Sequence, residues 1–215
     1  MSVPFIEIDF TARSEGAIFD TTRPDVAQAA GLQGRGAAPL VSPLAEGYLL
    51  EGLYEFLKDK KEGTYSIDIP AEKAFGKKDA KKIRLVGLGK FRQNDMKPYP
   101  GMEVEVDNAR GVVRSVSSGR VLVDFNHPLA GKAVSYDVEL KRFVSDPGEC
   151  FAALLNLLLG MPKDRVSSRV EGSKLTVTVS LKQQVPDAMF SELATMGSEL
   201  IEGVDEIVVE QKVEA

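Results

Sequence analysis

The residues best placed to do chemistry lie in segment 126–132, which combines the only His of the chain with a proline, a glycine and a small apolar pair. An X-Pro step and a glycine make this segment an ordered loop with an apolar tip. Two upstream segments, 18–22 and 71–76, add a Phe-Asp pair and a Phe-Gly pair. Together the three segments offer aromatic and aliphatic surface, without the residues of a catalytic triad.

The sequence shows no pattern that is typical of a metal site or of a disulfide. One His and one Cys exclude the usual zinc patterns, and no cluster of carboxylates has the spacing of a calcium loop. Cys150 is the only Cys, so it cannot form an intramolecular disulfide, which fits a reducing cytoplasm. We therefore expect a cytoplasmic protein without metal or cofactor, in which Cys150 is a small buried hydrophobe on a helix.

The composition limits the kinds of partner. Of 215 residues, 43% are hydrophobic and 27% are charged, which is ordinary for a soluble globular protein. The net charge of −5 argues against general nucleic-acid binding, which depends on neutralising phosphates. No apolar run approaches the ~20 residues of a membrane span, and the first residues are not expected to form a secretory signal. We interpret the local basic cluster as a solvated loop face; it comprises Lys77, Lys78, Lys81 and Lys82.

The first 82 residues carry strand and helix patterns in turn. Strands are expected where apolar and polar residues alternate, at 3–13, 16–22, 39–41 and 65–70. Pro24 opens a short helix over 24–30 that Gly31 ends, and Gly34 and Gly36 mark a surface loop. The main helix is expected over 48–58, because its apolar residues recur at spacings of three and four.

The next region, 83–126, has the pattern of a small β domain. Strands are expected at 83–88, 102–106, 112–116 and 120–125. A Ser-Ser-Gly sequence at 117–119 is typical of a hairpin turn. A strong strand pattern then returns over 133–143.

Residues 145–215 read as a third, α+β unit. Asp146, Pro147 and Glu149 form a capping box that opens a helix, and Gly160 ends it. The buried face of this helix is expected to comprise Phe151, Leu154, Leu155 and Leu158. A hairpin, a second helix and a closing strand follow, at 166–170 with 175–181, at 186–201 and at 207–209.

In their order along the chain, the three segments resemble the FKBP-type peptidyl-prolyl cis/trans isomerases, and in particular their SlyD-like branch. The resemblance implies an α+β fold in which an antiparallel half-barrel wraps a helix. It implies an isomerase domain at 1–82 and 127–144 with an inserted chaperone domain at 83–126. Residues 145–215 resemble the C-terminal extension of long archaeal-type members.

The resemblance also implies a proline-binding pocket. Carried over residue by residue, its aromatic and acidic positions are Phe10, Phe19, Asp20, Phe75 and Tyr136, and its aliphatic positions are Leu49, Leu50, Leu53, Leu129 and Ala130. Two positions depart from the family. Phe10 stands where a Tyr hydroxyl often bonds to the Asp, so Asp20 needs another donor or stays partly solvated. Leu53 replaces a Trp at the pocket floor, which makes a shallower base.

Such a pocket suits the implied reaction. Rotation about an X-Pro bond passes a barrier of ~18–20 kcal/mol because amide resonance is lost, and it requires no nucleophile, metal or cofactor. An apolar site excludes the water that stabilises the planar amide, and it holds the prolyl ring. The alternatives are that the aromatic residues are plain core, that Asp20 is a turn residue, and that His127 is a structural loop residue.

The expected partners are unfolded or partly folded polypeptides that contain X-Pro bonds. The insert would offer strand edges and apolar residues to a client, namely Leu85, Leu88, Phe91, Met96 and Met102. A catalytically weak holdase with the same fold is the main alternative, and a structural scaffold is a weaker one. A second apolar stripe at Leu157 and Leu159 favours a homodimer through 145–215, unless the chain covers both helices itself.

Overall fold

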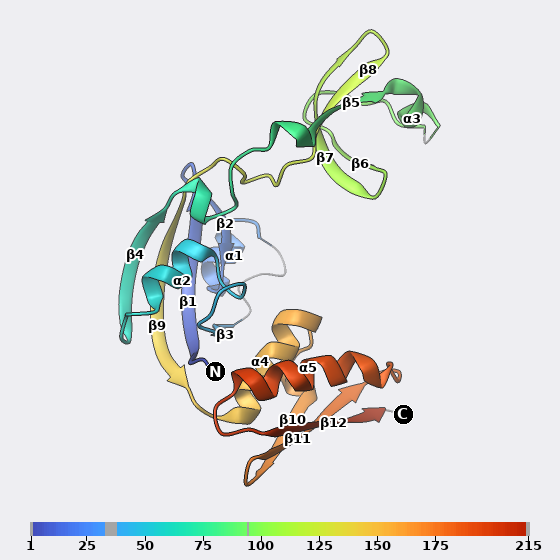
Figure 1. Ribbon diagram of the computed structural model, residues 1–215. Coiled ribbons are helices and arrows are strands. Elements are labelled where there is room, and N and C mark those ends of the chain that lie inside the picture. Colours follow the sequence, from blue (N-terminus) through green and yellow to red (C-terminus); the bar gives the residue numbers. More distant parts are fainter. Residues whose placement is uncertain (1, 33–37, 94, 214–215) are drawn as a thin grey trace. The chain divides into compact units, whose positions relative to one another are not determined.

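The computed structural model describes residues 2–32, 38–93 and 95–213 (Figure 1). The chain divides into two compact units, of which the first comprises 1–69 with 134–215 and the second 70–133. Each unit is described by itself. The predicted loop at Gly34 and Gly36 lies outside the described residues.

The first unit is built on a five-stranded antiparallel sheet. Its strands are β1 (Phe5–Ser14), β2 (Ala17–Thr21), β3 (Leu40–Pro43), β4 (Gly63–Ile69) and β9 (Val134–Val144). Their order is β2-β1-β9-β4, and β3 pairs with the first half of β1 while β2 pairs with its second half. Along β1, Ile6, Ile8, Phe10 and Ala12 are all buried, which is the period of two that the sequence predicts.

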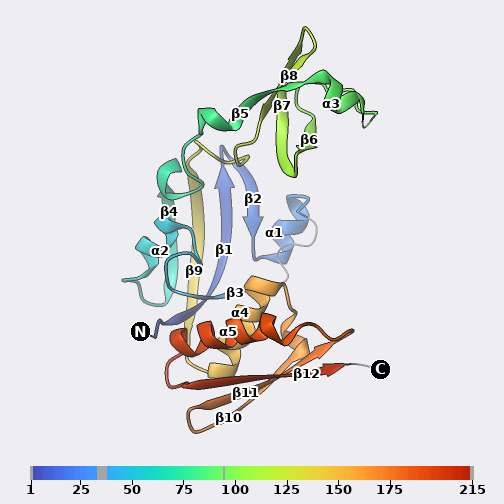
Figure 2. The same ribbon diagram turned by 45° about the vertical axis from the view of Figure 1, so that its right-hand side comes forward.

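Two helices accompany this sheet. The short helix α1 (Pro24–Ala29) lies beside β2, and Gly31 follows it in the left-handed region at φ 69°. Helix α2 (Glu51–Leu57) contacts β4 and lies beside it in Figure 2. Its Leu53 and Leu57 side chains are buried. It is shorter than the predicted 48–58, because Leu50 has the extended ψ of 138° and only caps the helix.

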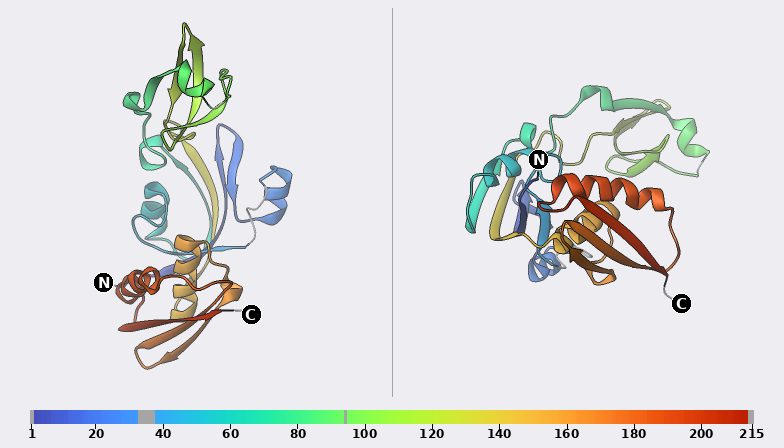
Figure 3. Two further views of the ribbon diagram at one scale, coloured as in Figure 1. Left: turned by 90° about the vertical axis from the view of Figure 1, so that its right-hand side faces the viewer. Right: turned by 60° about the horizontal axis from the view of Figure 1, so that its bottom comes forward.

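The C-terminal part of the first unit has two helices on one face of a three-stranded sheet (Figure 3). The strands are β10 (Val166–Glu171), β11 (Lys174–Leu181) and β12 (Glu206–Val213), and the helices are α4 (Pro147–Leu159) and α5 (Asp187–Leu200). A short 3₁₀ turn at Lys163–Arg165 precedes β10. The β10–β11 pair is antiparallel and the β11–β12 pair is parallel, with α5 as the crossover that a parallel pair requires.

Helix α4 begins and ends as the sequence predicts. The Asp146 carboxylate accepts a hydrogen bond from the Glu149 N–H at 2.7 Å, and Gly160 ends the helix at φ 66°. The predicted buried face is wrong at one position. Phe151, Leu154 and Leu155 are buried, but Leu158 is 44% exposed, because the buried part of α4 ends at Leu155.

One continuous apolar core joins the C-terminal helices to the five-stranded sheet. Phe5 and Val41 of that sheet pack in the same cluster as Phe151 and Phe190. The Val3 N–H also donates to the Leu200 carbonyl at 3.0 Å. The two parts therefore form one compact unit, and their separation into two domains stays a prediction from the sequence.

The second unit is a four-stranded antiparallel sheet with a helix that the sequence did not predict. The strands are β5 (Ile83–Gly87), β6 (Glu103–Val106), β7 (Ala109–Ser117) and β8 (Arg120–Asp124), in the order β5-β8-β7-β6. Helix α3 (Leu88–Arg92) follows β5, and 3₁₀ turns at Ala71–Lys73 and Ala80–Lys82 precede it. Ser118 and Gly119 both have positive φ, which is the conformation of a type I′ hairpin turn.

Phe91 corrects one expectation about the second unit. It is 1% exposed and packs with Val104, Val113 and Val121 in the core of the unit, so it is not available to a client. Leu85 in contrast is 61% exposed on β5. Across the part of the chain that the structure describes, no helix has the length and apolarity to span a bilayer.

Candidate functional site

A β-bulge in β2 turns two neighbouring side chains to one face of the sheet. Ala12 pairs with Asp20 and Arg13 pairs with Ile18, so Phe19 is an extra residue between the two pairs. In a regular strand Phe19 and Asp20 would point to opposite faces. Here the Phe19 ring instead meets the Tyr136 ring edge to face, with centroids 6.3 Å apart and planes at 82°.

Tyr136 is the centre of this aromatic cluster, which we define as Phe10, Phe19 and Tyr136. The Phe10 and Tyr136 rings lie 5.5 Å apart at 45°. Phe10 is 8% exposed and Tyr136 is 6% exposed. The structure thus brings together three predicted site residues from β1, β2 and β9, and β9 is far from the other two strands in the sequence.

Two threonines tie the end of β2 to the backbone of Phe10. The Thr22 hydroxyl accepts the Phe10 N–H at 2.8 Å and donates to the Asp9 carboxylate at 2.9 Å. The Thr21 hydroxyl donates to the Phe10 carbonyl at 2.9 Å. These side chains replace a strand partner at the point where β1 passes from β3 to β2, a role that the sequence pattern alone does not predict.

The Asp20 carboxylate accepts a hydrogen bond from a neighbouring residue at the end of β2, and it lies near Tyr136. The Thr21 N–H donates to the Asp20 carboxylate at 3.0 Å, which answers the lack of a hydroxyl on Phe10. Burial raises the pKa of the Tyr136 phenol well above its usual range, and the negative charge of Asp20 raises that pKa further. Tyr136 therefore keeps its proton at every physiological pH.

The aliphatic positions of the first unit gather at the start of α2. Leu49 and Leu50 immediately precede the helix and are half-buried. Leu53 lies one turn further on and is buried, as a pocket floor would require. The close approach of these leucines to the aromatic cluster stays a prediction.

The other predicted residues lie in the second unit, in two loops that we call the flap loops (71–76 and 126–132). The Gly131 N–H donates to the Gly76 carbonyl at 2.8 Å. The rings of Phe75 and His127 stack with centroids 4.4 Å apart and planes at 4°. Leu129 and Ala130 form the tip of the second loop, where the Ala130 N–H donates to the His127 carbonyl at 2.9 Å. Segments 50 residues apart in the sequence thus form one flap structure.

A polar network joins the two chain segments that connect the flap loops to the sheet of the second unit. The Asn126 side chain accepts the Asp79 N–H at 2.8 Å and donates to the Asp79 carbonyl at 3.0 Å. Asp124 accepts hydrogen bonds from the Arg114 guanidinium at 2.7 Å and from the Asn126 N–H at 2.9 Å. Burial opposes the charge of Asp124, but these donors outweigh it and lower its pKa to about 2.

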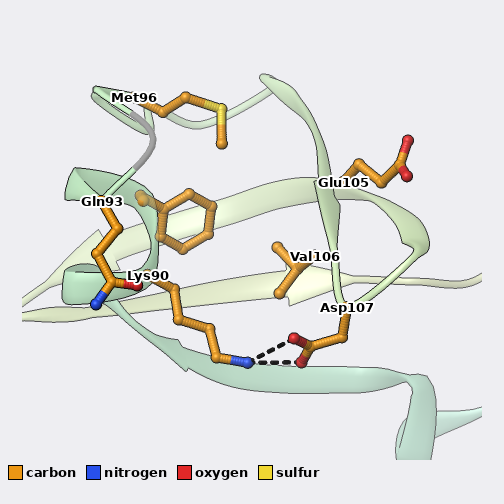
Figure 4. Close-up of a pocket in the computed structure, with 7 residues that line it drawn as sticks. Lys90, Gln93, Met96, Glu105, Val106 and Asp107 are labelled. Carbon is orange, nitrogen blue, oxygen red and sulfur yellow. Dashed lines mark hydrogen bonds and ion pairs between the residues drawn. The ribbon is translucent and has the colours of Figure 1, made fainter.

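Hollows lie beside β6 in the described part of the second unit. One of about 200 Å³ lies between α3 and β6, where Lys90 Nζ lies 2.6 Å from Asp107 Oδ2. Figure 4 shows this ion pair at the rim, with Met96 on the opposite side. The other, of about 460 Å³, lies beside β6 and β7 and is lined in part by Val104, Val112 and Pro128. Both lie next to β6, which is an edge strand of its sheet.

Metal ligands do not gather anywhere in the described ranges. Within 2–32, 38–93 and 95–213, no three His, Cys, Asp or Glu side chains lie together as a metal site would need. The candidate site consists instead of aromatic and aliphatic side chains, with Asp20 as its charged member.

Comparison with known proteins identifies the family. A family model described as the IF domain of FKBP26 matches residues 84–129. The chain is 26% identical over 140 residues to the short-type peptidyl-prolyl cis-trans isomerase of Methanocaldococcus jannaschii. The aligned stretch covers 64% of this chain and 89% of that protein. It is 29% identical over 156 residues to the FKBP-type isomerase SlyD of Treponema pallidum, covering 70% of this chain and 81% of the relative.

A third relative has higher identity over a shorter stretch. The probable FKBP-type 16 kDa peptidyl-prolyl cis-trans isomerase of Pseudomonas fluorescens is 32% identical over 109 residues, which are 48% of this chain and 71% of that protein. Antiparallel sheets, the aromatic cluster and the flap loops agree with this assignment. The chain therefore belongs to the FKBP-type, SlyD-like peptidyl-prolyl cis-trans isomerases.

Proposed function

We propose that this enzyme isomerises X-Pro bonds in unfolded or partly folded polypeptides and so accelerates proline-limited folding. The observation that carries the proposal is the aromatic cluster, which the bulge at Phe19 assembles from three strands. The resemblance to the family assigns Phe75, Leu129 and Ala130 of the flap loops to the same function. The names of its relatives support the same activity.

The proposed mechanism needs only apolar surroundings and positioning. The aromatic cluster holds the prolyl ring while the preceding peptide rotates, so part of the entropic cost is met on binding. Exclusion of water removes the hydrogen bonds that favour the planar, charge-separated amide. Asp20 is a charged group beside the cluster, because its negative charge acts on the Tyr136 phenol.

The direct test is cis/trans exchange of a short proline peptide, measured by NMR without a coupled protease. We expect exchange to become faster at enzyme concentrations far below that of the peptide. Exchange at the uncatalysed rate, together with retained binding of unfolded protein, would support the holdase alternative.

We further propose that the second unit captures unfolded chains. Its sheet has two edge strands, β5 and β6, whose free backbone groups can pair with an extended client. Exposed apolar side chains lie on the same unit, including Leu85 at 61% and Tyr99 at 62%. The hollow beside β6 and β7 offers apolar walls next to one of these edges.

Replacement of residues 83–126 by a short link tests this second proposal. Activity on a short peptide should be retained, whereas catalysis of the folding of a whole protein should fall at least tenfold, because the client is no longer held near the site. Equal losses on both substrates would mean that this region only supports the flap loops.

We also propose a homodimer through 145–215, in the cytoplasm. Leu158, Leu159 and Met189 expose 44%, 37% and 40% of their surface at the ends of α4 and α5. A symmetric contact would cover such residues on both copies. Light scattering should give twice the monomer mass for the full chain and a monomer for Leu158→Glu.

The proposed cytoplasmic location rests on Cys150, because a free thiol is typical of a reducing compartment.

A further inference from the structure

We propose that His127 is a positioning residue of the isomerase site, which works as a neutral imidazole with its proton on Nε2. Its ring holds Phe75, and its Nδ1 holds the tip of the second flap loop at Leu129. The inference rests on the isomerase function proposed above and assigns a task to the only His of the chain.

The stack on Phe75 is the first observation. The two rings are 4.4 Å apart and nearly parallel at 4°, although they belong to loops more than 50 residues apart in the sequence. A parallel stack restricts rotation of both rings, because any tilt would bring their atoms into contact. His127 is itself exposed, so burial in a core does not explain the arrangement. The contact therefore serves to fix the Phe75 ring.

The hydrogen bond to Leu129 is the second observation, and it is independent of the first. The Leu129 N–H donates to Nδ1 of His127 at 3.1 Å. An acceptor nitrogen must carry a lone pair, so the proton of the neutral ring lies on Nε2. An imidazolium has protons on both nitrogens and cannot accept this bond. The loop tip is therefore held by one tautomer of the neutral side chain.

Two further contacts fix the frame in which His127 acts. The Gly131 N–H bonds to the Gly76 carbonyl at 2.8 Å, on the far side of the loop tip. Asn126 precedes His127, and its side-chain amide accepts a hydrogen bond from the Asp79 N–H and donates one to the Asp79 carbonyl. These hydrogen bonds hold the second flap loop on both sides of His127. Between them, the single imidazole contacts both Phe75 and Leu129. Both are residues that we assign to the proline site.

NMR of the imidazole nitrogens tests the tautomer directly. Because the chain has one His, a ¹⁵N-labelled sample gives one imidazole spin system without any assignment problem. At mildly alkaline pH we expect the Nε2–H tautomer in the folded protein and a mixture of tautomers in urea. A folded protein with the proton on Nδ1, or with the mixture seen in urea, would overturn the inference whatever the activity.

Three substitutions separate the two contacts. His127→Phe keeps a ring that can stack but has no acceptor. His127→Asn keeps an acceptor that reaches the N–H two residues ahead, as in an Asx turn, but has no ring to stack. His127→Ala keeps neither. We expect kcat/KM on a proline peptide to fall about tenfold in His127→Ala and about threefold in each of the other two.

The outcomes distinguish this inference from the proposed function. An inactive wild-type enzyme would refute the function itself. An active wild type with equal activity in His127→Ala would refute only the role of His127. Partial rescue by both Phe and Asn, with unchanged midpoints of urea unfolding, is the result that a positioning role predicts, because a purely structural residue would change the midpoints as well.

Discussion

Asp20 and Tyr136 flank Ala12 in a single row across β2, β1 and β9. Ala12 pairs with Asp20 on one side and with Tyr136 on the other, so all three side chains point to the same face. The methyl group of Ala12 is fully buried and leaves space for the larger neighbours to approach across it. The charge of Asp20 accordingly acts on the Tyr136 phenol. This row is the link between the Phe-Asp motif and the aromatic cluster.

The aromatic cluster predicts the effect of truncating its central ring. Tyr136→Ala should lower kcat/KM on a proline peptide at least tenfold, because both Phe10 and Phe19 lose their ring partner. Exchange NMR on the peptide measures this loss. Tyr65→Ala is the control, since Tyr65 lies on β4 against Phe56 and not in the cluster. Equal activity of the two variants would contradict the site assignment.

Loss of the hydrogen bonds of the threonine pair should lower the free energy of unfolding. Thr22→Val removes the acceptor of the buried Phe10 N–H and the donor to Asp9. A buried N–H without a partner costs about 1–3 kcal/mol, so the free energy of unfolding should fall by about that amount. Urea denaturation measures the change. The exposed Thr64 on β4 provides the control, and Thr64→Val should change the stability by less than about 0.5 kcal/mol.

Asp124 predicts a pH-dependent contribution to stability. Its folded pKa of about 2 lies below the ordinary value of 3.8, so its charged form stabilises the fold. That contribution is complete above about pH 4 and is lost as the pH falls through about 2. Asp124→Asn should therefore lower the free energy of unfolding by about 1–2 kcal/mol at neutral pH, and the difference should shrink towards about pH 2.

Urea denaturation at several pH values measures this difference. The matched control is Asp107→Asn, because Asp107 forms an ion pair with Lys90 in which its side chain is 74% exposed. Exposed pairs contribute about 0–1 kcal/mol. A loss in the Asp107 variant as large as that in the Asp124 variant would contradict the role given to burial.

We expect the thiol of Cys150 not to react in the folded protein. Burial raises its pKa, and the nearby charges of Glu149 and Asp146 contribute to a final value of about 12. Thiolate is the reactive form, so an aromatic disulfide reagent should react with Cys150 only after urea unfolds the chain. Since the chain has one Cys, the absorbance change reports this site alone. Rapid reaction in native buffer would contradict the burial.

Much of the fold could be predicted from the sequence, because strand alternation and helix caps are local signals. The capping of α4 by Asp146 and its end at Gly160 are examples. Helix α3 was missed because its five residues are too few to show a period. Leu158 was misplaced because periodicity gives the face of a helix but not the length of the surface that covers it.

The site was harder to predict than the elements that carry it. The motif residues identify Phe19 and Asp20, but the sequence gives no sign that a bulge turns both to one face. The contacts of Asn126 and His127 across the flap loops depend on tertiary structure and have no local signal. The segment Asp-Phe-Asn-His could have suggested a polar network, since three of its side chains bind backbone groups or charged partners.

Refolding of a protein whose slow phase is limited by an X-Pro bond tests most directly whether the chain catalyses isomerisation in a folding polypeptide. The slow phase should accelerate in proportion to the amount of enzyme at substoichiometric concentrations, and Tyr136→Ala should largely abolish the effect. A slow phase that keeps its uncatalysed rate at every enzyme concentration would contradict the account.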